Sequence, residues 1–330
     1  MPSAQRKVVV LGTGGTIAGT SQSALDNTGY RAGQVAVHGL IDAVPALAAV
    51  PLEAEQVAQI DSKDMGVAVW QALARRIDAH LQRADVAGIV VTHGTDTLEE
   101  TAYFMQRVLA PAKPVVLTAA MRPATSLQAD GPQNLLDAVT VAVHPQARGV
   151  VAVLAGTVHS GADLRKLHTY RLDAFTSGDA GALARIEEGR LRVFRPWPEG
   201  DALGLAWIDR DLSQWPRVEI VINHAGSDGA IVDALLAIGI DGLVIAGTGN
   251  GTVSEGLMAA ARRALAAGVK VIRASRCAIG AVVGGAEAGR DEFESAGSLS
   301  PVQARIELLL RGPQSAPVQA RGIKPRSDRP

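Results

Sequence analysis

Short apolar segments alternate with amphipathic segments along the first half of the chain. The apolar segments are rich in β-branched residues and lack a polar alternate face, which is typical of strands buried on both sides. They lie at residues 8–11, 57–60, 88–91, 115–118 and 150–154. Between them, apolar residues recur at helical spacing over residues 65–84, 98–109 and 135–143. This alternation predicts a parallel sheet that helices cover on both faces.

The alternation stops near residue 185, and prolines and glycines interrupt the segment that follows, so residues 191–217 are interpreted as a linker. Beyond it, expected strands and helices alternate again, at 218–222, 230–238, 242–246, 254–267, 269–273 and 302–310. We therefore predict an α/β protein with two domains. Residues 1–190 form the larger N-terminal domain, with a parallel-rich sheet flanked by helices, and residues 218–311 form a smaller C-terminal α/β domain. Residues 312–330, rich in proline and basic side chains, are expected to be a disordered tail.

The composition of the 330 residues removes several classes of function. The net charge is −1 and aromatic residues make up 3% of the chain, so neither a basic surface nor a stacking platform for nucleic acid is expected. A single cysteine, Cys277, excludes an intramolecular disulfide and a multi-cysteine metal site. The longest stretch without charge, residues 8–25, is interrupted by glycines and cannot span a membrane. We expect a cytoplasmic protein, or a periplasmic one if a leader was removed before residue 1.

A loop rich in glycine and threonine, residues 12–19 (GTGGTIAG), directly follows the first expected strand. A dinucleotide-binding fingerprint would need a sixth-position glycine where Ile17 stands, and a phosphate-binding loop would need a lysine in place of Thr20. Neither nucleotide motif is complete. The loop is instead interpreted as one that brings bare backbone amides and the Thr16 hydroxyl close to a ligand.

A second unusual motif, residues 92–97 (THGTDT), follows another expected strand. Part of it fits a structural role, because Thr97 and Glu100 have the spacing of a helix capping box. Ligands bind outside the carboxyl ends of strands in an open parallel sheet, which is where both threonine loops fall. A threonine hydroxyl needs a base to become a nucleophile. Nearby histidines and Lys166, which could point into the same cleft, are the candidates.

The two motifs together resemble those of the bacterial-type L-asparaginases, the asparaginase/glutaminase family, and most of all its type II branch. Similar segments occur in family order over about residues 5–310, at 13–19, 93–97, 99–103, 113–116, 120–123, 129–132, 249–251 and 275–276. The resemblance implies the same two-domain α/β fold. It also implies hydrolysis of the side-chain amide of L-asparagine to L-aspartate and ammonia, without a metal or an organic cofactor.

The resemblance also implies a role for each catalytic residue. Thr16 is similar to the family's nucleophile, and Tyr30 to a tyrosine on a mobile lid that hydrogen-bonds that threonine. Thr95, Asp96 and Lys166 resemble a second catalytic group, in which Lys166 accepts a proton through Thr95.

The expected substrate-binding residues follow from the same resemblance. Ser62 and Asp96 are expected to hold the α-carboxylate and α-amino groups, with Gly15 and Lys63 in the same set. Glu287 resembles a glutamate that neighbouring subunits contribute to one another's sites. A homotetramer built from intimate dimers is implied.

Two positions depart from the type II pattern. Lys63 stands where glutamine or glutamate is more usual, and it brings a positive charge near the site of the α-amino group. Gly226 stands where the family often has a polar side chain that reaches across the subunit interface. Both leave the preference between asparagine and glutamine open. An enzyme that accepts both amides, and a binding or sensor protein with slow turnover, remain as alternatives.

Overall fold

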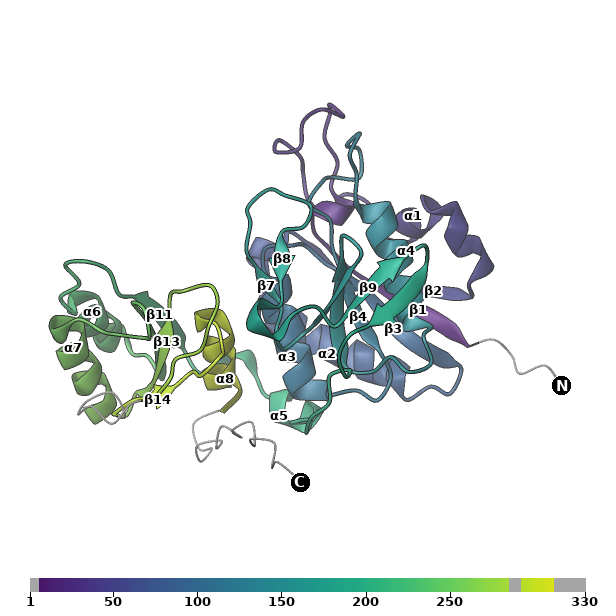
Figure 1. Cartoon of the computed structure of the whole chain (residues 1–330). Helices are drawn as coiled ribbons and strands as arrows, with labels where there is room; N and C mark the ends of the chain where they lie inside the picture. The colour runs from purple at the N-terminus through teal and green to yellow at the C-terminus, as the bar shows by residue number, and fades with distance from the viewer. Residues whose placement is uncertain (1–5, 285–291, 312–330) are drawn as a thin grey trace, which may run out of the picture. The chain divides into compact units, whose positions relative to one another are not determined.

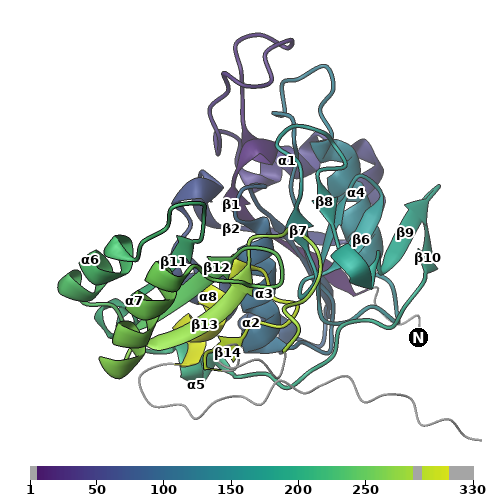
Figure 2. The ribbon, with the colours of Figure 1, turned by 60° about the vertical axis from the view of Figure 1, so that its left-hand side comes forward.

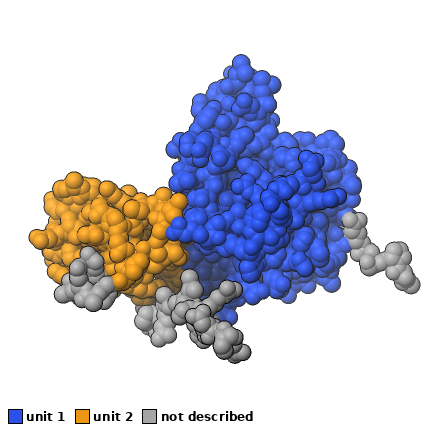
Figure 3. Space-filling view, in the orientation of Figure 1, with its two compact units in different colours: residues 1–213 blue, residues 214–330 orange. Residues whose placement is uncertain are grey.

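The computed structural model of the chain describes residues 6–284 and 292–311. The chain divides into two compact units, which meet in the sequence at Ser213 and Gln214 (Figure 3). The expected tail, residues 312–330, lies outside the described residues. No helix in the described ranges combines the length and the apolar character that a membrane span requires.

Unit 1 is built around an eight-stranded sheet in the order β10-β9-β6-β5-β4-β3-β1-β2 (Figure 1). Its parallel part contains β1 (Lys7–Gly14), β2 (Leu52–Ile60), β3 (Val86–Thr92), β4 (Val115–Thr118) and β5 (Val150–Leu154). Three antiparallel strands extend it: β6 (Thr157–Ser160), β9 (Ala184–Glu187) and β10 (Arg190–Val193). The hairpin of β9 and β10 ends the sheet at one edge (Figure 2). The predicted parallel-rich sheet is confirmed.

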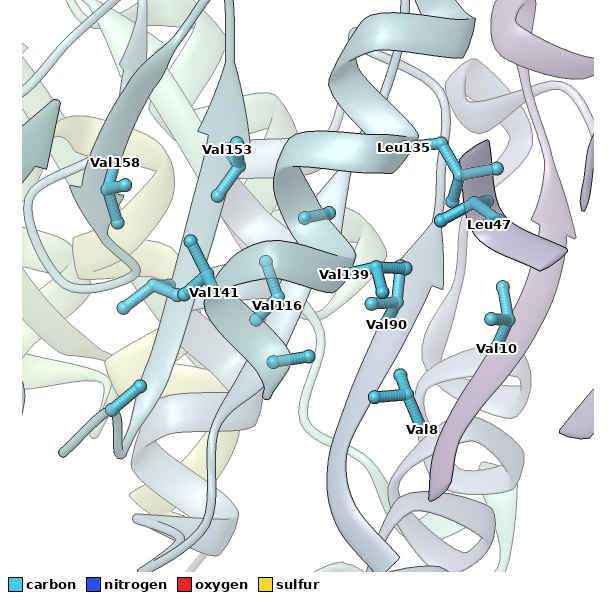
Figure 4. Packing of buried hydrophobic residues seen from close by; sticks show 14 of the residues in the cluster. Val8, Val10, Leu47, Val90, Val116, Leu135, Val139, Val141, Val153 and Val158 are labelled. Carbon is cyan, nitrogen blue, oxygen red and sulfur yellow. The ribbon is translucent and has the colours of Figure 1, made fainter. Parts of the chain in front are cut away.

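Apolar side chains fill both faces of this sheet. On one face, Val8 and Val10 of β1 pack with Val139 and neighbouring residues of α4 (Gly131–Ala142), as Figure 4 shows. Val9 and Leu11, which alternate with them, are equally buried and point to the opposite face. Helices α2 (Val67–Leu81) and α3 (Leu98–Leu109) pack against the strands and against each other. The continuous valine-rich segments of the sequence are therefore strands that are buried on both sides.

Unit 2 has its own parallel sheet, β11-β12-β13-β14. Its elements are β11 (Val218–Ile222), α6 (Ala230–Ile238), β12 (Gly242–Gly247), α7 (Glu255–Ala266), β13 (Lys270–Ser275), β14 (Glu294–Ser295) and α8 (Pro301–Arg311). Leu243 and Ile245 of β12 belong to the same apolar cluster as residues of α6 and α7. Val244 between them is equally buried and faces the other side of the sheet, which α8 also contacts. The predicted smaller α/β unit is confirmed.

The elements that the sequence did not predict are short or lie at an edge. They include β6, β9, β10, β14, the two-stranded sheet of β7 (Arg165–Lys166) and β8 (Phe175–Thr176), and the helices α1 (Val37–Asp42) and α5 (Leu205–Ile208). Strand β2 begins five residues before the expected position because it is an edge strand with partly exposed residues. Such strands lack the continuous apolar segment that marks a buried one.

Candidate active site

The two threonine loops lie at the point where the strand order of unit 1 reverses. Along the parallel part of the sheet the order is β2-β1-β3-β4-β5, so the chain proceeds from β1 toward one edge and from β3 toward the other. In open α/β sheets of this order, the crevice at the carboxyl ends of β1 and β3 is where ligands bind. Thr16 follows β1 and Thr95 follows β3, so both hydroxyls belong to this crevice.

Two glycines bring these loops into contact. The backbone of Gly15 has φ of +81°, and a Cβ atom there would lie 2.3 Å from the Cα atom of Gly94. A Cβ atom on Gly94 would in turn lie 2.3 Å from the Ser62 hydroxyl oxygen. Only glycine permits this approach of one backbone to another. Because Thr16 and Thr95 each follow one of the touching glycines, the sequence places both at the same junction.

Thr16 begins the short 3₁₀ helix η1 (Thr16–Ala18) and is buried. Its Oγ1 atom lies 2.7 Å from the hydroxyl oxygen of Tyr30, so the expected pairing of these side chains is present. Tyr30 belongs to a segment that projects from unit 1 (Figure 1). The segment is closed at its base by two backbone hydrogen bonds between Thr20 and Arg31. Thr16 therefore takes its hydroxyl partner from a loop and not from the sheet.

Lys166 reaches the second loop from strand β7. Its Nζ atom donates hydrogen bonds to Oγ1 of Thr95, at 3.0 Å, and to Oδ1 of Asp96, at 2.6 Å. The Lys166 side chain is 18% exposed and that of Asp96 is 55% exposed, so the amine is shielded while the carboxylate stays open to solvent. The amine and the carboxylate form an ion pair. Sequence spacing alone would make Lys166 a surface lysine, and the fold joins it to the loop 71 residues earlier.

Ser62 connects a third strand end to the second loop. It begins η3 (Ser62–Asp64) after β2 and is buried. Its hydroxyl accepts a hydrogen bond from the backbone N–H of Asp96 at 3.3 Å, and its carbonyl accepts one from the Thr97 hydroxyl at 2.7 Å. The capping box expected at Thr97 is therefore wrong in one part. Thr97 stands at the N-cap position of α3, but its side chain makes no capping bond there, because it is bonded to Ser62.

Lys63 lies beside the site with its charge balanced by its neighbours. Its Nζ atom is 2.6 Å from a carboxylate oxygen of Asp64 and 3.4 Å from one of Asp61, and its side chain is 61% exposed. The hydrogen bond that Lys63 donates to the Asp64 carboxylate raises the pKa of the Lys63 amine. The positive charge of Lys63, which the sequence suggested would lie beside the α-amino group, is thus paired with two carboxylates.

Two further expectations fall elsewhere. Gly226, in unit 2, has φ of +80°, a left-handed backbone that favours glycine. A turn of this geometry is a local physical reason for the departure from the type II pattern. Glu287 lies outside the described residues.

Two titratable groups near the site are Glu99, which was not singled out from the sequence, and His93, one of the nearby histidines considered as a base. Glu99, in the first turn of α3, is partly buried. Burial, and to a smaller extent the negative charge of nearby Glu100, raises the pKa of its carboxyl to about 7. The backbone N–H of Lys166 donates a hydrogen bond to this carboxyl, which lowers the pKa. His93 is completely buried, and burial lowers its pKa to about 4. The sequence places both next to catalytic candidates, but only the fold shows their burial.

A separate cavity of about 340 Å³ in unit 1 lies beside β6 and β8 and is lined by residues that include His159, Arg171 and Arg185. None of the expected catalytic side chains lines it. Within residues 6–284 and 292–311, no group of three or more histidine, cysteine, aspartate or glutamate side chains is arranged to hold a metal ion.

The arrangement has the parts that amide hydrolysis needs. One hydroxyl is paired with a phenol, and a second is bonded to an amine that a carboxylate orients. The backbone N–H of Thr95 has no hydrogen-bond partner among the described residues. Two hydroxyls, an amine and a backbone donor thus lie at one junction, and these are groups that nucleophilic hydrolysis of an amide can use.

Comparison with known proteins agrees along nearly the whole chain. The family model described as "Asparaginase, N-terminal" matches residues 7–199, and "Glutaminase/Asparaginase C-terminal domain" matches residues 217–316. L-asparaginase 2 of Escherichia coli is 38% identical over 92% of this chain and 88% of its own length. A glutaminase-asparaginase of Pseudomonas fluorescens is 37% identical over 92% of this chain and 85% of its own. The crystal structure of a probable cytoplasmic L-asparaginase from Campylobacter jejuni superimposes with a TM-score of 0.86 at 35% identity, covering 92% of this chain and 94% of that one.

Proposed function

The chain belongs to the bacterial-type L-asparaginase family, and we propose that it hydrolyses L-asparagine to L-aspartate and ammonia with Thr16 as the nucleophile. The observation that carries the proposal is the pair of hydrogen bonds from Lys166 to Thr95 and Asp96, at the junction where Gly15 meets Gly94. No metal or organic cofactor takes part in the proposed reaction.

In the first step, the Thr16 hydroxyl oxygen attacks the carbon of the side-chain amide. A bond forms between that oxygen and the carbon, the carbon–nitrogen bond breaks, and the nitrogen leaves as ammonia after gaining a proton. Tyr30, whose oxygen is 2.7 Å from Thr16, orients the hydroxyl for attack. The free backbone N–H of Thr95 supports the developing oxyanion. Water then attacks the ester, which releases aspartate and restores the Thr16 hydroxyl.

The relay of Thr95, Lys166 and Asp96 moves the proton. In the ligand-free arrangement the Asp96 carboxylate lies 2.6 Å from Nζ and forms an ion pair with Lys166. When substrate binds, its α-ammonium group shares this half-exposed carboxylate and weakens its hold on Lys166. The amine can then accept a proton through Thr95 and return one to the leaving nitrogen. Substrate binding and activation of the base are thus coupled at Asp96.

Ser62 and Asp96 form the proposed clamp for the α-carboxylate and α-amino groups, with Gly15 and Lys63 beside them. A clamp on both α-groups fixes how far the side-chain carbonyl reaches toward Thr16, and such positioning supplies much of the rate enhancement of an enzyme. It also favours a free amino acid over an asparagine inside a protein, where neither α-group is free.

The remaining proposals rest on family membership. We place the protein in the cytoplasm and expect a homotetramer built from intimate dimers, in which each Glu287 completes a neighbour's site. Relatives carry names that point to both compartments, one a probable periplasmic L-asparaginase of Haemophilus influenzae and one a probable cytoplasmic enzyme of Campylobacter jejuni.

A second candidate function is hydrolysis of asparagine and glutamine at similar rates. Relatives named glutaminase-asparaginase, 34–37% identical to this chain, favour it. Steady-state ammonia release from the two amides, measured side by side, separates the functions. The main proposal expects a higher kcat/KM for asparagine. Equal values would support the dual activity, and binding of aspartate without any ammonia release from either amide would overturn both.

The nucleophile is tested separately with a slowly hydrolysed substrate analogue. Peptide mass spectrometry of the trapped ester should locate the acyl group on Thr16. An ester on Thr95 would exchange the roles of the two threonines.

A further inference from the structure

A buried chain of hydrogen bonds lies beneath the second threonine loop. The indole Nε1 of Trp70, in α2, is 2.9 Å from Oγ1 of Thr101, in α3. The same oxygen is 2.9 Å from Nε2 of His93, which follows β3. The other ring nitrogen of His93, Nδ1, is 2.7 Å from the carbonyl oxygen of Gly94. Trp70 is 3% exposed, and Thr101 and His93 are completely buried.

The chemistry of the two end members fixes the direction of the bonds in this chain. An indole nitrogen can only donate, so Trp70 donates to the Thr101 oxygen. The Gly94 carbonyl oxygen can only accept, so Nδ1 of His93 carries the ring hydrogen and donates it to Gly94. In the neutral ring Nε2 is then bare, and it accepts the hydroxyl hydrogen of Thr101. His93 is the neutral Nδ1–H tautomer, in keeping with the burial that lowers its pKa to about 4.

The last bond of the chain determines the orientation of a peptide in the active site. The Gly94 carbonyl and the Thr95 N–H belong to the same peptide group and point in opposite directions across it. An anchored carbonyl on the core side directs the N–H away from His93, and that N–H has no partner among the described residues. The same peptide fixes where the Thr95 side chain begins, and hence its alignment with Lys166.

We propose that His93 is a positioning residue, through which Trp70 and Thr101 hold the Gly94–Thr95 peptide in the orientation that catalysis requires. The inference rests on the proposed function, because it takes Thr95 as part of the relay. His93 itself does not touch the reacting atoms. Its effect should appear in the turnover step and leave the binding of the substrate almost unchanged.

Two replacements of His93 separate this role from simple core packing. The amide nitrogen of an asparagine falls near the position of Nδ1 and can still donate to Gly94, whereas that of a glutamine falls near Nε2 and cannot. We expect His93→Gln to lower kcat about 100-fold, the loss typical of a misplacement of about 1 Å. The kcat of His93→Asn should stay within about tenfold of the wild-type value, and KM for asparagine should change less than about threefold in both variants. Equal losses of kcat in the two variants, or none, would overturn the proposal.

A matched control uses another buried histidine of unit 1. His159 is 4% exposed, its Nδ1 lies 2.8 Å from the Ser177 hydroxyl, and burial lowers its pKa to about 4 as well. His159→Asn should lower the free energy of unfolding by an amount similar to that for His93→Asn, but leave kcat unchanged. A drop in kcat that followed stability alone would appear in this control too, and would count against a positioning role.

The tautomer gives a readout that needs no activity. In protein labelled with ¹⁵N-histidine, the two ring nitrogens of His93, assigned by their loss in His93→Asn, should show a protonated Nδ1 and a bare Nε2 near pH 7. A protonated Nε2 would reverse the chain and overturn the inference even if the protein is a fully active asparaginase. Failure of the unchanged protein to release ammonia would instead contradict the proposed function and leave the tautomer assignment standing.

Discussion

The two threonine loops meet at one junction but are held in different ways. Thr16 pairs with Tyr30 on a projecting segment, and the loop of residues 12–19 contains no charged side chain. Thr95 is bonded to a lysine, its neighbour Asp96 forms an ion pair with that lysine, and a buried chain of hydrogen bonds lies beneath it. The first loop thus depends on a partner from an exposed segment, whereas the second is anchored from below by buried side chains.

The difference assigns separate tasks to the two loops. The segment around Tyr30 is joined to its neighbouring loop by exposed and half-buried hydrogen bonds, such as those from the Ser21 N–H to Thr125 and from Ser126 to Asn27. Segments with few buried contacts open at low free-energy cost, and loops that admit substrate are of this kind. The second loop carries Asp96 and is bonded to Lys166 of β7, and the geometry of these charged groups is the part that must stay fixed. We therefore propose that the first loop serves access and nucleophile alignment, and that the second serves proton transfer.

The largest expected effect comes from replacing Lys166, the proposed base that is bonded to the second loop. Lys166→Met should fold normally and lower kcat about 10²–10⁴-fold, because it removes the proposed acceptor of the Thr95 proton. Steady-state ammonia release measures the loss, and a thermal unfolding curve checks the fold. Lys7→Met is the matched control, since Lys7 lies at the amino end of the same sheet and pairs with Glu53 and Asp85. Unchanged kinetics of Lys166→Met would remove the relay from the mechanism.

Low pH should destabilise the folded protein through a residue of the second loop, His93. His93 has a pKa of about 4 in the folded protein against an ordinary value of 6.5, so between these values the unfolded chain binds a proton that the folded protein does not. Stability therefore falls as pH drops from about 6.5 to 4, by roughly 3 kcal/mol for this group. Glu99 has a raised pKa and acts in the opposite sense, since its contribution is lost as pH rises through about 7.

Urea denaturation across this pH range tests the assignment. The free energy of unfolding of His93→Asn should decline less steeply toward pH 4 than that of the unchanged protein. His159 and Glu99 are present in both proteins, so their contributions cancel in the comparison. Parallel curves for the two proteins would show that His93 does not stay neutral in the folded state.

A smaller effect is expected at the first loop. Tyr30→Phe removes the hydrogen bond to Thr16 but keeps the ring, so kcat should fall about 10–100-fold as the nucleophile loses its alignment. Tyr170→Phe is a suitable control, because Tyr170 is exposed. Its ring contacts Arg122, and phenylalanine keeps that ring. If Tyr30→Phe lowered kcat as much as Lys166→Met, the proposed division of tasks between the loops would be wrong.

The strands and loops of this site can be predicted from the sequence, but most of the side chains that hold the loops in place cannot. The valine-rich strands and the two glycine-threonine loops are local patterns, so their place at strand ends could be inferred. Lys166 stands on a strand of two residues; the sequence offered it as one of several candidate bases, and the family resemblance selected it among them. Trp70 and Thr101 are 31 residues apart, and Thr97 and Ser62 are 35 apart. Hydrogen bonds of this range depend on how the helices pack, and no local pattern encodes them.

Lys63 is expected to have the smallest effect, although the sequence marks it as a departure from its family. Its amine is exposed and lies against Asp64 and Asp61, and exposed ion pairs contribute little because water and salt screen them. Lys63→Gln, which restores a more usual residue, should change KM for asparagine less than about threefold and leave kcat unchanged. Kinetics on asparagine and glutamine at low and high salt measure this. A tenfold or larger change in KM that salt suppresses would mean that the Lys63 charge reaches the substrate's α-amino group, and that the clamp beside the second loop is set by charge as well as by hydrogen bonds.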